Sequence, residues 1–220
     1  MNIVRNTIAL IIMIAVYASV NAQTTFGVRA GFNYSTVKSP KSGARIAKMY
    51  YTPGFHAGFN AEIPVAEGLY IQPGLLFTSK GHKAKPLDGL TYNEHTYYLE
   101  IPVNAVYKLE AGTGNILLGV GPYAAYGLWG RGKYSGEPND GEITKITFKK
   151  NGESTNGTMN YKPFDAGINT LLGYEFPSRF SIQLNTQFGL IDFFDDNSNA
   201  FARAIILQNQ VLGLSMGYRF

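Results

Sequence analysis

The residues of this chain best suited to chemistry are three histidines and a scatter of serines, and none of them forms a recognisable site. His82 and His95 fall in one predicted loop, whereas His56 belongs to a separate segment. The spacing of the three matches no metal-ligand pattern. Ser35 and Ser79 stand near segment ends without a nucleophile motif, and a catalytic triad is not recognisable from sequence order alone. We therefore predict no catalytic residues, no metal site and no cofactor.

A second set of chemically active residues consists of charged side chains that alternate with apolar ones. If the segments that carry them enclose an interior, these charges must pair there, because an unpaired buried charge is costly. The predicted interior network is Arg29, Glu62, Glu100, Glu175 and Arg219. The alternative is that the same groups line a gated or very narrow pore.

Period-two alternation of apolar and polar residues is the dominant pattern of the chain and recurs in eight segments. The segments span residues 26–34, 55–63, 69–77, 97–107, 118–128, 164–176, 180–190 and 212–220. Each has roughly the 9–11 residues that a tilted strand needs to cross the hydrocarbon layer of a bilayer. The pattern predicts an all-β fold, a single closed antiparallel transmembrane β-barrel of about eight strands.

A soluble β-barrel or sandwich would show the same alternation with its apolar face turned inward. The polar face discriminates, because a soluble exterior is normally about a quarter to a third charged. Here the polar face is rich in Gly, Asn and Gln and carries few charges. The composition therefore favours apolar side chains that face lipid and a polar lumen.

The connections between the segments alternate in length. Those over residues 65–68, 108–115 and 177–179 are short, and those over 35–52, 80–95, 130–162 and 192–204 are long. This alternation predicts short periplasmic turns and long extracellular loops. Within the third long connection, residues 143–150 and 158–162 are expected to form a hairpin extension.

The first 22 residues have the features of a secretory signal peptide. One positive charge precedes an apolar run over residues 7–16, which is too short to span a bilayer as a helix. Val20 and Ala22 then occupy the −3 and −1 positions of a cleavage site. We expect residues 1–22 to be removed and residues 23–220 to form one outer-membrane barrel domain. The alternative is an uncleaved anchor helix.

The composition excludes several classes of protein. The chain has no cysteine, so it forms no disulfide and carries no lipid on a cysteine. Removal of Arg5 from the 19 basic residues leaves 18 against 15 acidic ones, a mild excess that does not indicate nucleic-acid binding. Beyond the leader no stretch of 18 apolar residues predicts a transmembrane helix.

Basic residues gather in the long connections. The two groups are Lys38, Lys41, Arg45 and Lys48 in the first, and Lys80, Lys83 and Lys85 in the second. The first group, which contains no acidic residue, would form a basic collar that pairs with phosphates of lipopolysaccharide. The alternative is that these are ordinary solvated loops.

Aromatic residues lie at both ends of the apolar faces, which predicts two girdles at the membrane interfaces. The chain ends with Tyr218 and Phe220, which resemble the aromatic C-terminal signal read by the barrel assembly machinery. We therefore expect that machinery to be a partner during insertion.

Six short motifs keep a fixed order along the chain. They are GVRAGFNYS at 27–35, GFHAGF at 54–59, IQPGLLF at 71–77, YLEIPV at 98–103, GPY at 121–123 and GYRF at 217–220. Together they resemble the PorT-like, or porin-family, outer-membrane β-barrel domain family of Gram-negative bacteria. The resemblance implies an outer-membrane barrel and a location. It fixes no activity, although one branch of the family is associated with protein secretion and gliding machinery.

Three prolines within the predicted strands, Pro73, Pro102 and Pro122, each remove a ladder hydrogen bond, so we expect bulges there. The resemblance implies that they are features of the family.

The function expected from the whole sequence is a non-enzymatic outer-membrane barrel with a structural or interaction role through its extracellular loops. A narrow channel for small solutes is the second hypothesis, and an outer-membrane enzyme acting on lipid or protein is the third. Outer-membrane lipids are expected partners, nucleic acid is not, and the partner of the loops is unknown.

Overall fold

The computed structural model describes residues 24–38, 48–149, 157–193 and 207–220, and all of its regular structure is β-strand. The strands are β1 (Thr25–Lys38), β2 (Lys48–Tyr50), β3 (Thr52–Ala66), β4 (Leu69–Leu87), β5 (Leu90–Ala111), β6 (Gly114–Ser135), β7 (Ile143–Phe148), β8 (Thr158–Tyr161), β9 (Phe164–Glu175), β10 (Phe180–Gly189) and β11 (Gln208–Arg219). Within these ranges no helix is long and apolar enough to cross a membrane. The predicted signal peptide lies outside the described residues.

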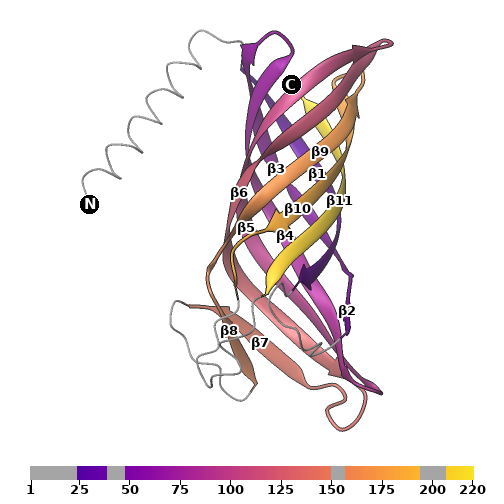
Figure 1. Ribbon diagram of the computed structural model, residues 1–220, viewed down its shortest axis with the longest axis vertical. Helices are drawn as coiled ribbons and strands as arrows, with labels where there is room; N and C mark the ends of the chain where they lie inside the picture. The colour runs from indigo at the N-terminus through magenta and orange to yellow at the C-terminus, as the bar shows by residue number, and fades with distance from the viewer. Residues whose placement is uncertain (1–23, 39–47, 150–156, 194–206) are drawn as a thin grey trace, which may run out of the picture.

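Eight strands pair into a closed ring in the order β1, β3, β4, β5, β6, β9, β10 and β11 (Figure 1). All of these pairings are antiparallel. The last strand closes onto the first in one register, from Gly27 opposite Arg219 to Lys38 opposite Gln208. The predicted all-β fold with about eight ring strands is therefore confirmed.

Side chains of the ring alternate between an apolar outer face and a polar inner face. Large outward residues are widely exposed, for example Phe32 at 75% and Phe59 at 68%. Inward polar residues are buried, with Ser215 at 0% and Glu100 at 1% exposure. A soluble barrel would place its apolar face in the core. The soluble alternative therefore does not hold, because this exterior suits an apolar solvent.

One end of the ring, here called the turn end, carries tight connections between strands. Gly68 and Gly112 have φ angles of +68° and +65° in two of these turns, a conformation that glycine adopts without strain. The C-terminus lies at the same end (Figure 1). There the Phe220 amide donates a hydrogen bond of 2.8 Å to the carbonyl oxygen of Phe26, which ties the last residue to the first strand.

At the opposite end, here called the extended end, three strands continue past the others. β4, β5 and β6 have 19, 22 and 22 residues, whereas β9, β10 and β11 have 12, 10 and 12. Their outer parts project from the ring, with β2 paired to β4 and β7 paired to β6 (Figure 1). The predicted loop over residues 80–95 is therefore wrong. It is a continuous β-hairpin, because backbone pairing persists where the outward residues become polar.

The hairpin expected from residues 143–150 and 158–162 is also wrong. β7 and β8 pair in parallel, with Lys145 opposite Thr158. Ile146 and Tyr161 belong to a buried apolar cluster with Val37, Phe193 and Leu207. The parallel pairing is not that of a hairpin, and it accompanies burial of these apolar side chains.

The bulges expected at Pro73, Pro102 and Pro122 do not occur. β4 and β5 keep one register across Pro73, and β5 and β6 keep one register across Pro102 and Pro122. Each proline interrupts the ladder beside it without adding a residue to one strand. The register shifts of these strands lie at other positions, between Pro64 and Ala66, Ala84 and Leu87, and Tyr97 and Tyr98.

Candidate functional site

Seven inward charged residues form two clusters that span the lumen. The first, the turn-end cluster, comprises Glu62, Lys108, Glu175 and Arg219 from β3, β5, β9 and β11. Lys108 Nζ lies 2.8 Å from Glu62 Oε1 and 2.7 Å from Glu175 Oε1. Arg219 contacts the same two carboxylates, at 3.2 Å from Nη2 to Glu62 and 3.6 Å from Nε to Glu175. Two cations and two carboxylates thus form a balanced circuit across four strands.

The second cluster, the centre cluster, comprises Lys80, Glu100 and Asp165 and is almost completely buried. Lys80 Nζ lies 2.9 Å from Glu100 Oε2 and 3.1 Å from Asp165 Oδ2. The same ammonium group stands 4.4 Å from the centroid of the Tyr123 ring. Gln187 donates a hydrogen bond of 2.5 Å to the other oxygen of Glu100. The centre of the lumen is therefore occupied by side chains that hold one another in place.

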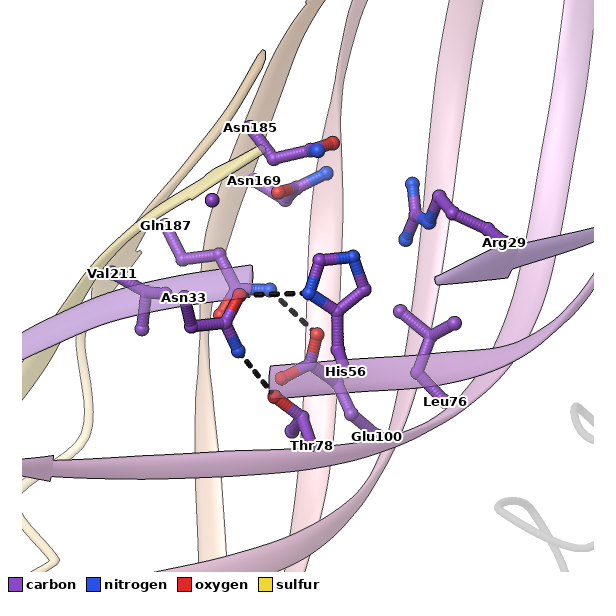
Figure 2. Close-up of a pocket in the computed structure, with 11 residues that line it drawn as sticks. Arg29, Asn33, His56, Leu76, Thr78, Glu100, Asn169, Asn185, Gln187 and Val211 are labelled. Atoms are coloured by element: carbon purple, nitrogen blue, oxygen red, sulfur yellow. Dashed lines mark hydrogen bonds between the residues drawn. The ribbon is translucent and has the colours of Figure 1, made fainter. Parts of the chain in front are cut away.

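Arg29 lies between the two clusters and faces a small polar cavity (Figure 2). Its guanidinium donates to Gln183 Oε1 at 3.4 Å. The cavity has a volume of about 20 Å³ and is also lined by His56, Glu100 and Asn169. This is room for a single water molecule, so the cavity does not form a passage for solutes.

His56 forms a chain of hydrogen bonds in the order of a catalytic triad. Its Nε2 lies 2.8 Å from Ser215 Oγ, and its Nδ1 lies 2.8 Å from Asn33 Oδ1. Asn33 in turn donates to Thr78 Oγ1 at 2.9 Å (Figure 2). The Ser215 hydroxyl is fully buried and also accepts a hydrogen bond of 2.7 Å from Asn185. A serine held in this way has no space for a substrate, so the geometry supports a structural role.

An aromatic residue, Phe148, forms an apolar plug that packs against inward side chains near the extended end. Phe148 at the end of β7 packs edge-on against Tyr98, with ring centroids 5.3 Å apart, and against Tyr161 at 6.1 Å. A Cβ atom at Gly127 would lie only 2.2 Å from the Phe148 ring. Glycine at that position of β6 therefore makes the space that the plug occupies.

A buried carboxylate, Glu94, fastens the plug to the wall of the extended end. Tyr161 donates a hydrogen bond of 2.6 Å to Glu94 Oε2, and Tyr92 donates one of 3.3 Å. His82 Nδ1 lies 3.7 Å from the other oxygen. Burial, reinforced by Glu94, raises the pKa of Tyr161 well above its usual value, so the phenol remains a hydrogen-bond donor at physiological pH.

The structure places the five predicted network residues in the lumen but in separate groups. Glu62, Glu175 and Arg219 come together in the turn-end cluster. Glu100 belongs to the centre cluster, and Arg29 lies between. Arg219 meets Glu62 and Glu175 because the three residues share one level at the turn end.

Most of the predicted lipopolysaccharide contacts lie outside the described residues. Lys38 is exposed at the end of β1. Lys48 begins β2, although its side chain is outside the described residues, as are Lys41 and Arg45. The predicted assembly signal is at the turn end, where the exposed rings of Tyr218 and Phe220 stand 5.7 Å apart.

Three residues that organise the lumen were missed by sequence reasoning. Lys80 was assigned to a loop and Lys108 to a turn, whereas both are inward strand residues with carboxylate partners. Asp165 falls in the predicted segment 164–176 but belongs to no predicted network. The two-residue alternation could have identified Lys80. It lies an even number of residues from Gln72 and Thr78 and therefore faces inward as they do.

Among the described residues no group of three His, Asp or Glu side chains is arranged to hold a metal ion. His82 and His95 lie on opposite faces of the extended sheet, because His95 is paired with Gly81, the neighbour of His82. The three histidines therefore do not converge.

The family model of the outer membrane protein β-barrel domain matches residues 21–195 of the chain. No curated protein sequence matches it significantly. The fold of this chain is similar to that of Ail of Yersinia pestis, which was crystallised with the heparin analogue sucrose octasulfate. The two share 14% sequence identity with a TM-score of 0.42, and the match covers 90% of this chain and 99% of Ail. The fold is also similar to that of OprG from Pseudomonas aeruginosa, at 12% identity, a TM-score of 0.45, and coverage of 90% and 97%. A major outer membrane protein of Thermus thermophilus gives 13% identity, a TM-score of 0.45, and coverage of 90% and 100%.

Proposed function

Because this chain belongs to the outer membrane protein β-barrel domain family and lies in the bacterial outer membrane, we propose that it is a non-enzymatic barrel whose extended end carries its interactions outside the cell. The turn end then faces the periplasm, as short connections do in this class of protein. Within the family, the six sequence motifs favour the PorT-like branch. The protein remains anchored by the ring and works through its projecting surface.

The observation that carries this proposal is the filled lumen. The turn-end cluster and the centre cluster bridge opposite walls, and the Phe148 ring packs against the inward Tyr98 near the extended end. An eight-stranded barrel is only wide enough for its own side chains. A lumen occupied in this way argues against the channel hypothesis, and the buried Ser215 argues against the enzyme hypothesis. The remaining working surface is the exterior of the extended end.

The extended end has the dimensions of a binding surface. Leu90 to Tyr97 of β5 runs about 23 Å along the strand beyond the aromatic end of the ring. β2, β4, β5, β6 and β7 widen this part into a continuous sheet. A paired sheet holds its side chains in fixed positions, which suits recognition of a partner better than isolated loops do.

Conductance in planar bilayers tests the filled lumen. We expect the purified, refolded full-length protein to give no steady current, while a large porin in the same bilayers conducts. Discrete current steps that scale with the amount of inserted protein would support the channel hypothesis and overturn this proposal.

Orientation is tested with single cysteines, since the chain has none of its own. Asp88→Cys places a thiol in the exposed turn at the extended end, and Glu67→Cys is the matched acid-to-cysteine change in an exposed turn at the turn end. A membrane-impermeant maleimide added to intact cells should label D88C and leave E67C unlabelled until the cells are lysed. The reverse pattern would invert the proposed orientation.

A further inference from the structure

An aromatic belt marks the level at which the ring meets the extended sheet. It consists of Phe55, Phe77, Tyr97 and Trp129 on the neighbouring strands β3, β4, β5 and β6. Successive ring centroids lie 5.9 Å apart for Phe55 and Phe77 and 5.8 Å for Phe77 and Tyr97, and Tyr97 stacks on Trp129 at 5.2 Å. Aromatic side chains of this kind favour the boundary between hydrocarbon and headgroups.

Directly beyond the belt, the outward face of the same strands becomes basic. Arg131 of β6 stands opposite His95 of β5 and Lys145 of β7. One rung further out, Lys133 stands opposite Asn93, and Asn93 stands opposite Lys83 of β4. We call Lys83, Arg131, Lys133 and Lys145 the basic band.

The height of the basic band is that of lipid headgroups. Arg131 follows Trp129 by two residues, which is about 7 Å along a strand. A strand tilt of about 40° reduces this to roughly 5 Å along the membrane normal, and Lys133 then lies about 10 Å above the belt. Long basic side chains at this height reach the polar headgroups from the protein wall.

No ion pair among the described residues neutralises the charges of the basic band. Arg131, Lys133 and Lys145 are exposed and form no ion pair with another residue in the described part of the chain. The inward lysines, Lys80 and Lys108, each have two carboxylate partners. The basic band thus differs from the lumen, where the lysines are paired. An unpaired cluster of positive charge is suited to binding an external anion.

In the part of the chain that the structure describes, the acidic residues of the extended end lie apart from the basic band. Glu94 points inward, where Tyr161 and Tyr92 hold it. Among the described residues, the exposed acids of this end lie in or beside the hairpin tips, further from the belt, and are Asp88, Glu137, Asp140 and Glu142. The order from the belt outward is therefore aromatic, basic, acidic.

His95 adds a hydrogen-bonding group to the band without adding a charge. Burial and the adjacent Arg131, only partly opposed by Glu94, lower the pKa of His95 below its usual value. The imidazole is therefore neutral near pH 7, and the positive charge of the band comes from its lysines and arginine.

We propose that the basic band binds the phosphate groups of a phosphorylated glycolipid of the outer leaflet, the lipid A part of lipopolysaccharide. This site is separate from the basic group predicted at Lys38, Lys41, Arg45 and Lys48. It rests on the proposed function in one respect, that the extended end is outside the cell. A lipid suits the band better than a soluble polyanion does, because the belt holds the band at the membrane and the acidic tips repel an anion arriving from solution.

Trp129, the single tryptophan of the chain, lies beside the band and reports on its occupancy. The full-length protein in neutral detergent is titrated with bis-phosphorylated lipid A while tryptophan fluorescence is recorded. We expect saturable binding that weakens about fivefold in Arg131→Gln and about a hundredfold in R131Q/K133Q/K145Q, the scale of basic residues at an anionic lipid surface. Arg179→Gln is the matched control, since Arg179 is an exposed arginine of the turn end, and its affinity should equal that of the wild type.

Two further ligands identify what the band recognises. Lipid A without phosphates should bind the wild type no better than it binds the triple variant, and a soluble inorganic polyphosphate should compete only at far higher phosphate concentration. Equal affinity of R131Q, R179Q and wild type for lipid A would overturn the site, as would equal binding of the lipid without phosphates. Polyphosphate that binds as tightly as lipid A would replace the lipid by a soluble polyanion. If D88C is labelled on intact cells and no current flows, such a failure concerns the band alone and leaves the proposed function standing.

Discussion

Replacement of Lys80 by methionine tests whether the centre cluster holds the barrel together. Methionine keeps the length of the side chain and removes its charge. Glu100 and Asp165 would then share a buried site without the ammonium group that now lies 2.9 Å and 3.1 Å from them. The new side chain has no means of satisfying either carboxylate, and both are nearly inaccessible to water.

The expected cost of Lys80→Met is about 3–5 kcal/mol of unfolding free energy, the usual result of removing one partner from a buried ion pair. With a denaturant slope of about 2–3 kcal/mol per molar, the urea midpoint should fall by roughly 1–2 M. Replacement of all three charges, in K80M/E100Q/D165N, should recover most of that loss, because no unpaired charge remains. Lys85→Met on the same strand is the control, since Lys85 is exposed and should change the midpoint little.

The assay is equilibrium unfolding in urea, with folded protein scored by its faster gel migration before boiling. An unfolding free energy of K80M within about 0.5 kcal/mol of the wild-type value would refute the reasoning. Failure of the triple variant to recover stability would also contradict the reasoning, because no unpaired buried charge remains in it.

Three other perturbations have defined outcomes. Gly127→Ala places a Cβ 2.2 Å from the Phe148 ring and should expel the plug, which would be seen as faster protease cleavage of the β7–β8 region; unchanged cleavage would contradict the plug. Ser215→Ala should cost about 1–3 kcal/mol, since His56 and its other neighbours lose a hydrogen-bond partner, and a serine-reactive fluorophosphonate should label neither protein; labelling of the wild type alone would revive the enzyme hypothesis. Deletion of Phe220 should lower the amount of protein in the outer membrane, and normal levels would reject the assembly signal.

Alternation in the sequence was sufficient to predict the ring, because a two-residue period determines which side chains face each way whatever the solvent. The pairings inside the lumen needed the structure. Lys108 meets Glu62 and Glu175 only because the closed ring brings β3, β5 and β9 to a common level. That level depends on the stagger between strands, which a single sequence does not state. The hydrogen-bond chain from Ser215 to His56 has the same origin, since 159 residues separate the two.

Strand ends were predicted too early because the end of the apolar face was taken as the end of the strand. On β6 the outward face passes from Tyr126 and Leu128 to Trp129, and then to Arg131 and Lys133, without leaving the sheet. The change of residue type at Trp129 therefore marks a change of solvent around a strand that continues. The same reasoning explains the two treatments of positive charge in this protein. An inward lysine is surrounded by other strands and is paired with their carboxylates. The outward charges of the basic band have no such partner among the described residues and would pair with phosphates at the membrane surface.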